Sequence, residues 1–186
     1  MRILGLVCSP RLHGNTEIMV RAALDKAQQE GADVELVTLA GKTISPCDAC
    51  YSCRKTGKCQ VEDDMQDIYT KLSEADGIIF GTPVYFWSVS AQAKALIDRT
   101  RLFSDKRELR NKVAGVVTVQ AGRGDIGALN VFSGFFAIQK MIMVGYATGF
   151  GSQEKGDVMN DEKGLKMSEA LGKTMVKYIQ SHEIPA

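Results

Sequence analysis

The sequence predicts a parallel, doubly wound α/β sheet of five strands with helices on both faces. Short apolar segments alternate along the chain with longer segments whose apolar residues recur every three or four positions. Strands of a parallel sheet are buried on both faces and apolar throughout, whereas the connecting helices are amphipathic. Neither a repeat nor a linker interrupts the alternation, so residues 1–186 are expected to form a single domain.

The first half of the chain contains three of the expected strands. Arg2–Val7 is a short apolar run that ends in a turn-rich loop, as a buried strand does. The next apolar stripe predicts a helix, and Gly31 lies where a glycine commonly terminates one. In order, the remaining elements of this half are a helix over Thr16–Glu30, an alternating strand over Asp33–Leu39, a helix from about Asp64 and an apolar strand over Gly77–Pro83.

The second half continues the same alternation. Ser88 or Ser90 is a suitable N-cap for the first helix of this half. The last helix has Leu171, Met175 and Tyr178 on its expected inner face. The elements are a helix over Ser90–Thr100, a strand over Val113–Val119, a helix over Ile126–Met141, a strand over Ile142–Thr148 and a helix over Asp161–Ser181.

Composition excludes several classes of protein. The formal net charge of +1 gives no electrostatic footprint for nucleic acid or for an anionic membrane. The most apolar stretch, Val131–Phe150, has Gln139 and Lys140 at its centre, so we expect a buried helix followed by a buried strand and not a membrane span. The N-terminal run is too short for a secretory signal, and we therefore expect a cytoplasmic protein with reduced thiols.

In doubly wound sheets, ligands bind beyond the carboxyl ends of the strands. The loop after the first expected strand, CSPRLHGNTE, offers hydroxyls, a cation and the start of a helix, which together favour an anion such as phosphate. It lacks the Walker A pattern, which disfavours an NTPase. An ordinary helix-capping turn remains the alternative. The candidate residues are Ser9, Arg11, Asn15 and Thr16.

Two further loops reach the same edge of the expected sheet. The aromatic triplet Tyr85–Trp87 can line a flat ring, cover the core or form a subunit contact. The glycine loop after the fourth strand matches G-x-G-x-x-G at Gly122, Gly124 and Gly127, but it follows the wrong strand and lacks the acidic residue of a dinucleotide site. We interpret it as a flexible glycine loop that lets a ligand approach the backbone closely.

Four of the five cysteines lie in one loop, at about residues 45–62, with the spacing C-x₂-C-x₂-C-x₅-C. This spacing is close to that of bacterial ferredoxins and favours a [4Fe–4S] cluster on Cys47, Cys50, Cys53 and Cys59. A zinc site, a redox dithiol and unoccupied thiols remain alternatives. Lys55 and Lys58 could offset the charge of a cluster. The fifth cysteine, Cys8, is expected to be a small buried hydrophobic residue, and Asp98 with Arg99 is interpreted as a charge pair at a helix end.

Together, GLVCSPRLHGNT, the cysteine loop, ADGIIFGTPVYFWSVSAQAKALIDR and AGRGD resemble the flavodoxin-like NADPH-dependent FMN reductase superfamily. The cysteine spacing is similar to that of its iron–sulfur flavoprotein branch. The resemblance implies a flavodoxin-like fold, a homodimer or homotetramer, and an FMN phosphate on the loop after the first strand. It also implies that the flavin ring contacts Pro83, Val84, Tyr85, Phe86 and Trp87, and that a loop with Ala121, Gly122 and Gly124 closes over it.

Three functions follow from these observations. In the first, a ferredoxin-like donor passes single electrons through the cluster to FMN and on to a small-molecule acceptor such as a quinone or an oxygen species. In the second, the protein is an NAD(P)H-dependent reductase of flavin, quinone or nitro compounds with no working cluster. In the third, it binds flavin as a carrier or sensor without turnover. No catalytic side chain is expected in any of them, because the cofactor would carry the chemistry.

Overall fold

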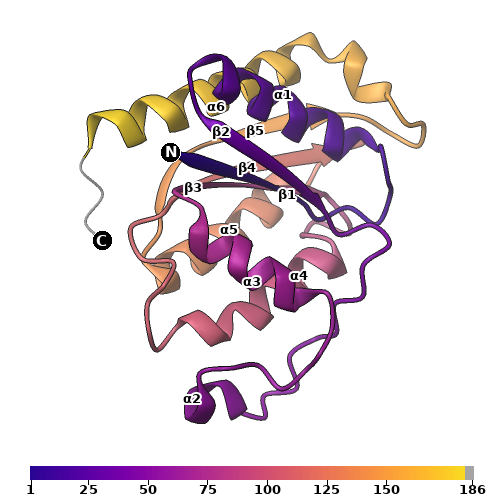
Figure 1. Cartoon of the computed structure of the whole chain (residues 1–186). Helices are drawn as coiled ribbons and strands as arrows, with labels where there is room; N and C mark the ends of the chain where they lie inside the picture. The colour runs from indigo at the N-terminus through magenta and orange to yellow at the C-terminus, as the bar shows by residue number, and fades with distance from the viewer. Residues whose placement is uncertain (183–186) are drawn as a thin grey trace.

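The protein is described by a computed structural model over residues 1–182. Five parallel strands form one sheet in the order β2-β1-β3-β4-β5, and helices cover both of its faces (Figure 1). This confirms the predicted fold class. The strands are β1 (Arg2–Val7), β2 (Asp33–Thr38), β3 (Gly77–Pro83), β4 (Val113–Gln120) and β5 (Ile142–Phe150).

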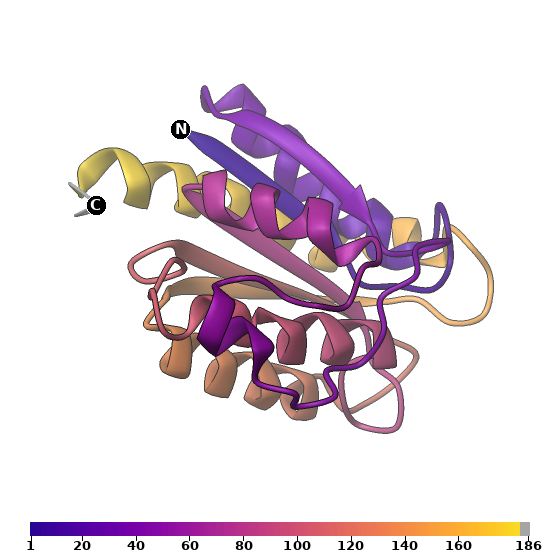
Figure 2. The same cartoon turned by 60° about the horizontal axis from the view of Figure 1, so that its bottom comes forward.

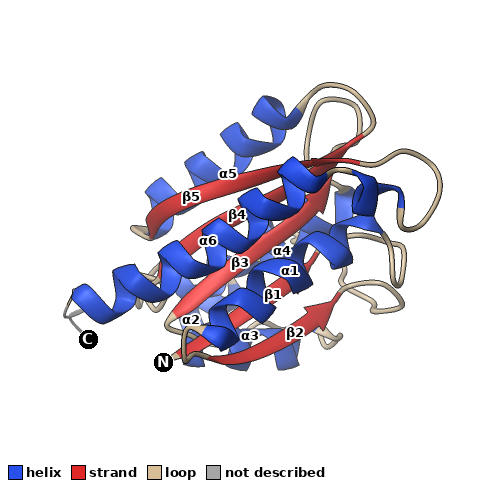
Figure 3. Cartoon of the chain, turned by 90° about the horizontal axis from the view of Figure 1, so that it is seen from above, coloured by secondary structure: helices blue, strands red, loops and turns tan. Residues whose placement is uncertain are grey.

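The helices divide between the two faces of the sheet. α1 and α6 pack side by side on one face, and α3, α4 and α5 cover the other (Figure 3). Gly172 of α6 lets the first pair approach closely, since a Cβ there would lie 2.0 Å from the carbonyl oxygen of Ala23. The helices are α1 (Asn15–Gln29), α2 (Ser52–Thr56), α3 (Met65–Glu74), α4 (Ala91–Arg99), α5 (Asp125–Gln139) and α6 (Glu162–Ser181), with 3₁₀ turns η1 (Thr100–Phe103) and η2 (Asp157–Asn160).

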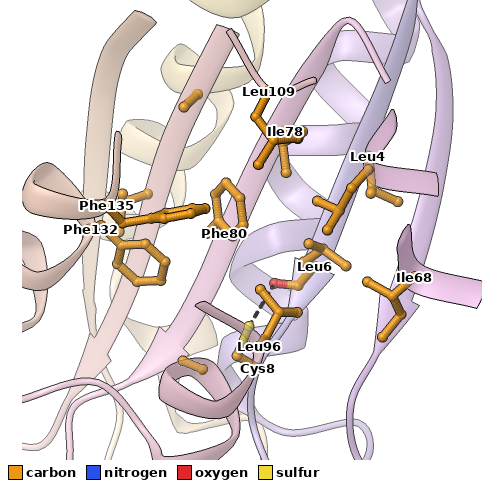
Figure 4. Close-up of a cluster of buried hydrophobic side chains, with 14 of the residues drawn as sticks. Leu4, Leu6, Cys8, Ile68, Ile78, Phe80, Leu96, Leu109, Phe132 and Phe135 are labelled. Atoms are coloured by element: carbon orange, nitrogen blue, oxygen red, sulfur yellow. Dashed lines mark hydrogen bonds between the residues drawn. The ribbon is translucent and has the colours of Figure 1, made fainter. Parts of the chain in front are cut away.

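Apolar side chains fill both layers between sheet and helices. On the α5 face, the ring of Phe80 packs on Phe132, Phe135 and Phe136 at centroid distances of 5.4 to 5.7 Å (Figure 4). Cys8 belongs to the same cluster, and its thiol donates to the carbonyl of Leu6 at 3.8 Å. Burial raises the pKa of this thiol to about 12, so Cys8 is inert, which agrees with its prediction as a small buried hydrophobic residue.

The strand order places the topological switch between β1 and β3. From β1 the chain moves outward to β2, then returns to the other side of β1 as β3. The loops that follow β1, β3 and β4 are held together there. Ser90 caps α4 by accepting from the amide of Ala93 at 3.1 Å, and its hydroxyl donates to the carbonyl of Cys8 at 2.5 Å. The N-terminus of α4 is therefore fixed at this edge.

One expectation about the chain's interior needs correction. The stretch 131–150 was predicted to continue into a buried strand, but β5 is an edge strand, and Met143, Tyr146 and Phe150 on it are exposed. An edge strand has only one neighbour and receives less cover from the helices. The helical part of the expectation is confirmed in α5. Over residues 1–182, no helix has the length and apolarity needed to cross a bilayer.

Candidate functional site

A small cavity of about 110 Å³ lies at the carboxyl ends of β1, β3 and β4. The structure brings many of the predicted flavin residues to it, although these segments are far apart in the sequence. Phe86, Trp87, Gly122 and Gly124 lie outside its lining. The predicted residues that line it are Ser9, Arg11, Asn15, Thr16, Pro83, Val84, Tyr85 and Ala121.

The N-terminus of α1 opens into this cavity. Gly14 is the N-cap and has no side chain to accept from the first amides of the helix, so these N–H groups are available to an anion. Ser9 and Thr16 are almost fully buried beside them. A backbone N–H of Arg11 donates to the Ser9 hydroxyl at 3.1 Å, which fixes the turn. The site therefore has the donors and the rigidity that bind a phosphate.

Glu17, in the first turn of α1, shapes the same loop. Its carboxylate accepts from the backbone amide of His13 at 2.9 Å and from the guanidinium of Arg21 at 2.8 Å. Burial alone would raise the pKa of Glu17, but the hydrogen bonds from Arg21 and His13 outweigh burial and lower it. The ionised carboxylate is thus already satisfied, and it holds the loop in place.

The loop after β5 forms a wall that the sequence analysis did not assign. Gly151 and Ser152 line the cavity, and Arg11 reaches across to donate to the carbonyl of Gln153 at 2.7 Å. The Asn15 amide donates to the Glu154 carbonyl at 2.9 Å and accepts from the Gly156 amide at 2.7 Å. The side chain of Asn15 therefore holds this loop, and its backbone N–H at the start of α1 remains available to a ligand. In the sequence, the glycines and the serine of GFGSQEKG, residues 149–156, were the signal that could have identified this wall.

The aromatic loop projects from the edge of the sheet as a tight turn. Tyr85 and Ser88 exchange two backbone hydrogen bonds of 3.0 Å, and Phe86 and Trp87 between them have φ values of 46° and 64°. Such left-handed angles are costly for bulky residues and cluster at functional sites. The Phe86 side chain is fully exposed and that of Trp87 is 65% exposed. The turn therefore offers two aromatic faces to a ligand or a partner.

The glycine loop packs against this aromatic turn. A Cβ on Gly127 would lie 1.8 Å from the carbonyl oxygen of Trp87, and one on Gly124 would lie 3.0 Å from its Cα. Gly124 also has a φ of 109°, which favours glycine. The group that approaches these glycines is the chain's own backbone at Trp87. Packing against the aromatic turn thereby explains Gly124 and Gly127 of the G-x-G-x-x-G pattern, whereas a Cβ on Gly122 would meet nothing within 4 Å.

The four clustered cysteines surround a second cavity, of about 300 Å³, at the cysteine loop. Cys47 and Cys50 are exposed, Cys53 and Cys59 are half-buried, and all four are free thiols. Cys53 lies on α2, a short helix that the sequence analysis missed and that Gly57 ends in a left-handed conformation. Across residues 1–182, no three ligating side chains converge closely enough to hold a single metal ion. The thiols instead share the wall of one larger space.

The cationic residues in this wall are Arg99 and Arg101, from the end of α4 and from η1, whereas the sequence analysis favoured Lys55 and Lys58. The predicted pairing of Asp98 with Arg99 is also wrong. Lys94 binds Asp98 at 2.8 Å, and Arg99 is buried and pairs with Asp63 at 2.7 Å. Sequence proximity was misleading because neighbours on a helix point about 100° apart.

Comparisons with known proteins agree with this geometry. The family model described as NADPH-dependent FMN reductase matches residues 1–155. An iron–sulfur flavoprotein of Methanocaldococcus jannaschii is 42% identical over 190 residues, which cover 97% of this chain and 98% of that protein. An iron–sulfur flavoprotein of Methanosarcina thermophila is 33% identical over 183 residues, or 97% and 96% of the two chains. A Bacillus subtilis protein provisionally named as an NAD(P)H-dependent FMN-containing oxidoreductase is 27% identical, with 92% and 96% covered.

Solved structures show the same fold. RosB with a bound riboflavin-5'-phosphate derivative has a TM-score of 0.78 at 17% identity, with 97% of this chain and 81% of that chain covered. A flavodoxin, WrbA-like protein from Agrobacterium tumefaciens has a TM-score of 0.69 at 19% identity, with 98% of each chain covered. The chain therefore belongs to the NADPH-dependent FMN reductase family, in its iron–sulfur flavoprotein branch, and is an FMN-dependent oxidoreductase.

Proposed function

We propose that the protein passes electrons from a one-electron donor of the ferredoxin type, by way of a [4Fe–4S] cluster, to FMN and on to a small-molecule acceptor. The observation that carries the proposal is that all four clustered thiols line one cavity, on a chain whose sheet edge carries a separate anion pocket. When bound, FMN supplies two-electron storage and the cluster supplies one-electron exchange.

The sheet-edge cavity fits the terminal phosphate of FMN. Its volume of about 110 Å³ suits a phosphate group and is too small for a three-ring system. The first amides of α1 would donate to the phosphate oxygens, and the buried hydroxyls of Ser9 and Thr16 would add to them. Arg11 would supply the positive charge. The flavin ring would then lie outside the cavity, against Pro83–Trp87. The glycine loop would support this turn through its contacts with the backbone of Trp87.

The cysteine cavity fits a cluster in the type of its donors and in its size. Four thiolates are the usual ligand set of a [4Fe–4S] cluster, and a cluster needs more room than one ion. Cys47, Cys50, Cys53 and Cys59 would hold it. Relatives that cover nearly the whole chain carry the name iron–sulfur flavoprotein, which supports the same assignment.

One helix connects the two sites. α4 begins at Ser90, which is bonded to the carbonyl of Cys8 at the sheet edge, and ends at Arg99 in the wall of the cysteine cavity. Nine helical residues span about 14 Å. α4 thereby fixes the positions of the two cavities relative to each other.

An NAD(P)H-dependent reductase without a cluster is the second candidate. The description of the matched family and the name of the Bacillus subtilis relative favour it. The choice between the two depends on the donor and on whether the thiols bind iron.

Analysis of anaerobically purified protein tests the proposal. We expect about one FMN, four iron and four sulfide per chain, and faster flavin reduction by reduced ferredoxin than by NADPH. Protein that holds FMN but no iron, and that NADPH reduces rapidly, would establish the second candidate. Protein that neither retains nor takes up FMN would overturn both.

We also propose that the chain forms a homodimer or homotetramer. The aromatic turn at Phe86 and Trp87 leaves large apolar side chains in solvent, which monomeric proteins seldom do over a continuous patch. Light scattering at micromolar concentration is expected to give at least twice the mass of one chain. A monomer mass for the loaded protein would contradict this.

A further inference from the structure

The cysteine loop contains little regular structure, yet both of its ends are held by one buried side chain. This side chain is Arg99, the last residue of α4, which is 2% exposed. Figure 2 shows the loop, with α2 in it, running outside the helix layer that contains α4. The contacts of the guanidinium show how a segment so poor in secondary structure is fixed.

The guanidinium binds the chain on both sides of the cysteines. Its Nη1 donates to the carbonyl of Ser45 at 2.9 Å, and its Nη2 donates to the carbonyl of Val61 at 3.1 Å. Ser45 lies two residues before Cys47, and Val61 lies two residues after Cys59. One planar group thus joins the start of the loop to its end.

A carboxylate completes the arrangement. Asp63 accepts from both Nη atoms of Arg99, at 2.7 and 3.1 Å, and from the backbone amide of Ser45 at 2.8 Å. The two side chains are 1% and 4% exposed, so water does not weaken the pair. Tyr69 fixes the base of Arg99, since its hydroxyl donates to the Arg99 carbonyl at 3.0 Å and accepts from Nε at 3.3 Å.

Only arginine can make this set of contacts. The guanidinium presents five N–H donors in a rigid plane, and it serves two carbonyls, a carboxylate and a phenol at once. A lysine ammonium at the same position keeps the charge but has three donors at a single point. The same guanidinium lines the cavity that the four thiols surround. Arg99 therefore holds the loop at the wall of the cavity, and Asp63 neutralises its charge there.

We propose that Arg99 is the positioning residue of the cysteine site: it sets the separation of Ser45 and Val61, and through it the placement of the four thiols. The part concerning the cluster rests on the proposed function. The part concerning the loop does not, because the bonds of Arg99 exist in the protein without metal.

Two single variants separate the hold on the loop from the charge. Arg99→Lys keeps the charge and loses the bonds to Ser45 and Val61. Arg101→Gln removes a charge from the same wall and breaks two exposed 3.3 Å hydrogen bonds to Asp105. In metal-free protein, hydrogen exchange of residues 45–62 is expected to accelerate at least tenfold in Arg99→Lys and to stay at the wild-type rate in Arg101→Gln. Exchange in β1 and β3 serves as the internal reference.

In anaerobically reconstituted protein, Arg99→Lys is expected to bind less iron at unchanged FMN content. Arg101→Gln is expected to keep its iron. Since Arg99→Lys leaves Asp63 poorly paired and can lower stability as a whole, the double variant Asp63→Asn/Arg99→Gln removes both buried charges together. It is expected to fold, by circular dichroism, and still to show fast exchange over 45–62.

The result that overturns the proposal is wild-type exchange over 45–62 in both Arg99→Lys and the double variant. Normal iron binding by a folded Arg99→Lys variant also overturns it. Wild-type protein that binds no iron under anaerobic conditions refutes the cluster, and with it the proposed function. The exchange measurement on metal-free protein still decides whether Arg99 holds the loop, so the two failures are distinguishable.

Discussion

The phosphate pocket at the sheet edge and the cysteine cavity beyond α4 are built in different ways. The pocket is formed by loops that leave adjacent parallel strands, and its buried donors include backbone amides at a helix start. The cysteine cavity is formed largely by a loop with one five-residue helix, and the buried ion pair of Arg99 and Asp63 holds this loop. Thus the fold itself creates the first site, whereas the second depends on a few side chains distant in sequence.

Loss of one proposed cluster ligand has the largest expected effect, and it tests whether the two sites are independent. Cys53→Ala is expected to lower the iron content from about four per chain to nearly none and to leave FMN content unchanged, because the two sites share no residue. Iron, sulfide and flavin assays on anaerobic protein measure this. Cys8→Ala is the matched control: Cys8 is buried outside the cavity, so its loss should leave iron unchanged. Loss of FMN along with iron in Cys53→Ala would show that the sites are not independent.

The next largest effect concerns the support of the aromatic turn. Gly127→Ala would place a methyl group against the Trp87 carbonyl, so the turn must move or α5 must shift. We expect a loss of about 1–3 kcal/mol in the free energy of unfolding and weaker FMN binding. Gly134→Ala on the same helix has open space around its Cβ and is expected to stabilise the protein by about 0.5–1 kcal/mol. Chemical denaturation measures the stability of the two variants, and flavin titration measures their affinity for FMN. Equal stability and equal affinity in the two variants would contradict the packing of Gly127 against Trp87.

A smaller effect is expected from the charge in the phosphate pocket. Arg11→Ala removes the cation that lines the pocket and its bond to the Gln153 carbonyl. A charge-assisted hydrogen bond contributes about 1.5–3 kcal/mol, so FMN affinity should fall about 10- to 100-fold. Riboflavin, which lacks the phosphate, is the control ligand and should bind with nearly unchanged affinity. An equal loss for both ligands would place the phosphate elsewhere.

The smallest expected effect is the response of the buried ion pair to pH. Burial alone would raise the pKa of Asp63, but hydrogen bonds from Arg99, Ser45 and Met65 outweigh burial and lower it. Since the folded pKa lies below the unfolded value of about 3.9, this contribution is present above that pH and is lost as pH falls through the folded pKa. Asp63→Asn should therefore reduce the acid sensitivity of unfolding. The pKa of Glu17, in the first turn of α1, is also lowered. Glu17→Gln should therefore reduce the acid sensitivity of unfolding in the same way.

The part of the molecule that could be predicted from sequence follows from local rules. The bounds of β1 and β3 agree with the predicted ranges, because short apolar runs between turn residues specify buried strands. The gathering of Ser9, Thr16 and Tyr85 at one cavity also follows, since parallel strands end at the same edge. Ser88 and Ser90 were the two predicted caps, and Ser90 is the one that caps α4.

The remainder depends on contacts that local patterns do not encode. Nothing near Arg99 in sequence indicates that it reaches Ser45, Val61 and Asp63, and its neighbour Asp98 suggested the wrong partner. Asn15 was predicted to bind phosphate, but its side chain is hydrogen-bonded to the loop after β5. In both cases a polar side chain found its partner through tertiary packing, which sequence spacing does not reveal.

The most direct test of the proposed function follows flavin reduction after anaerobic mixing with reduced ferredoxin, in wild type and in Cys53→Ala loaded with equal FMN. Dithionite, which reduces the flavin chemically, serves as the control for both proteins. We expect ferredoxin to reduce the flavin of wild type rapidly and that of Cys53→Ala at least tenfold more slowly, with equal final reduction by dithionite. Equal rates with ferredoxin in the two proteins would contradict the passage of electrons through the cysteine site.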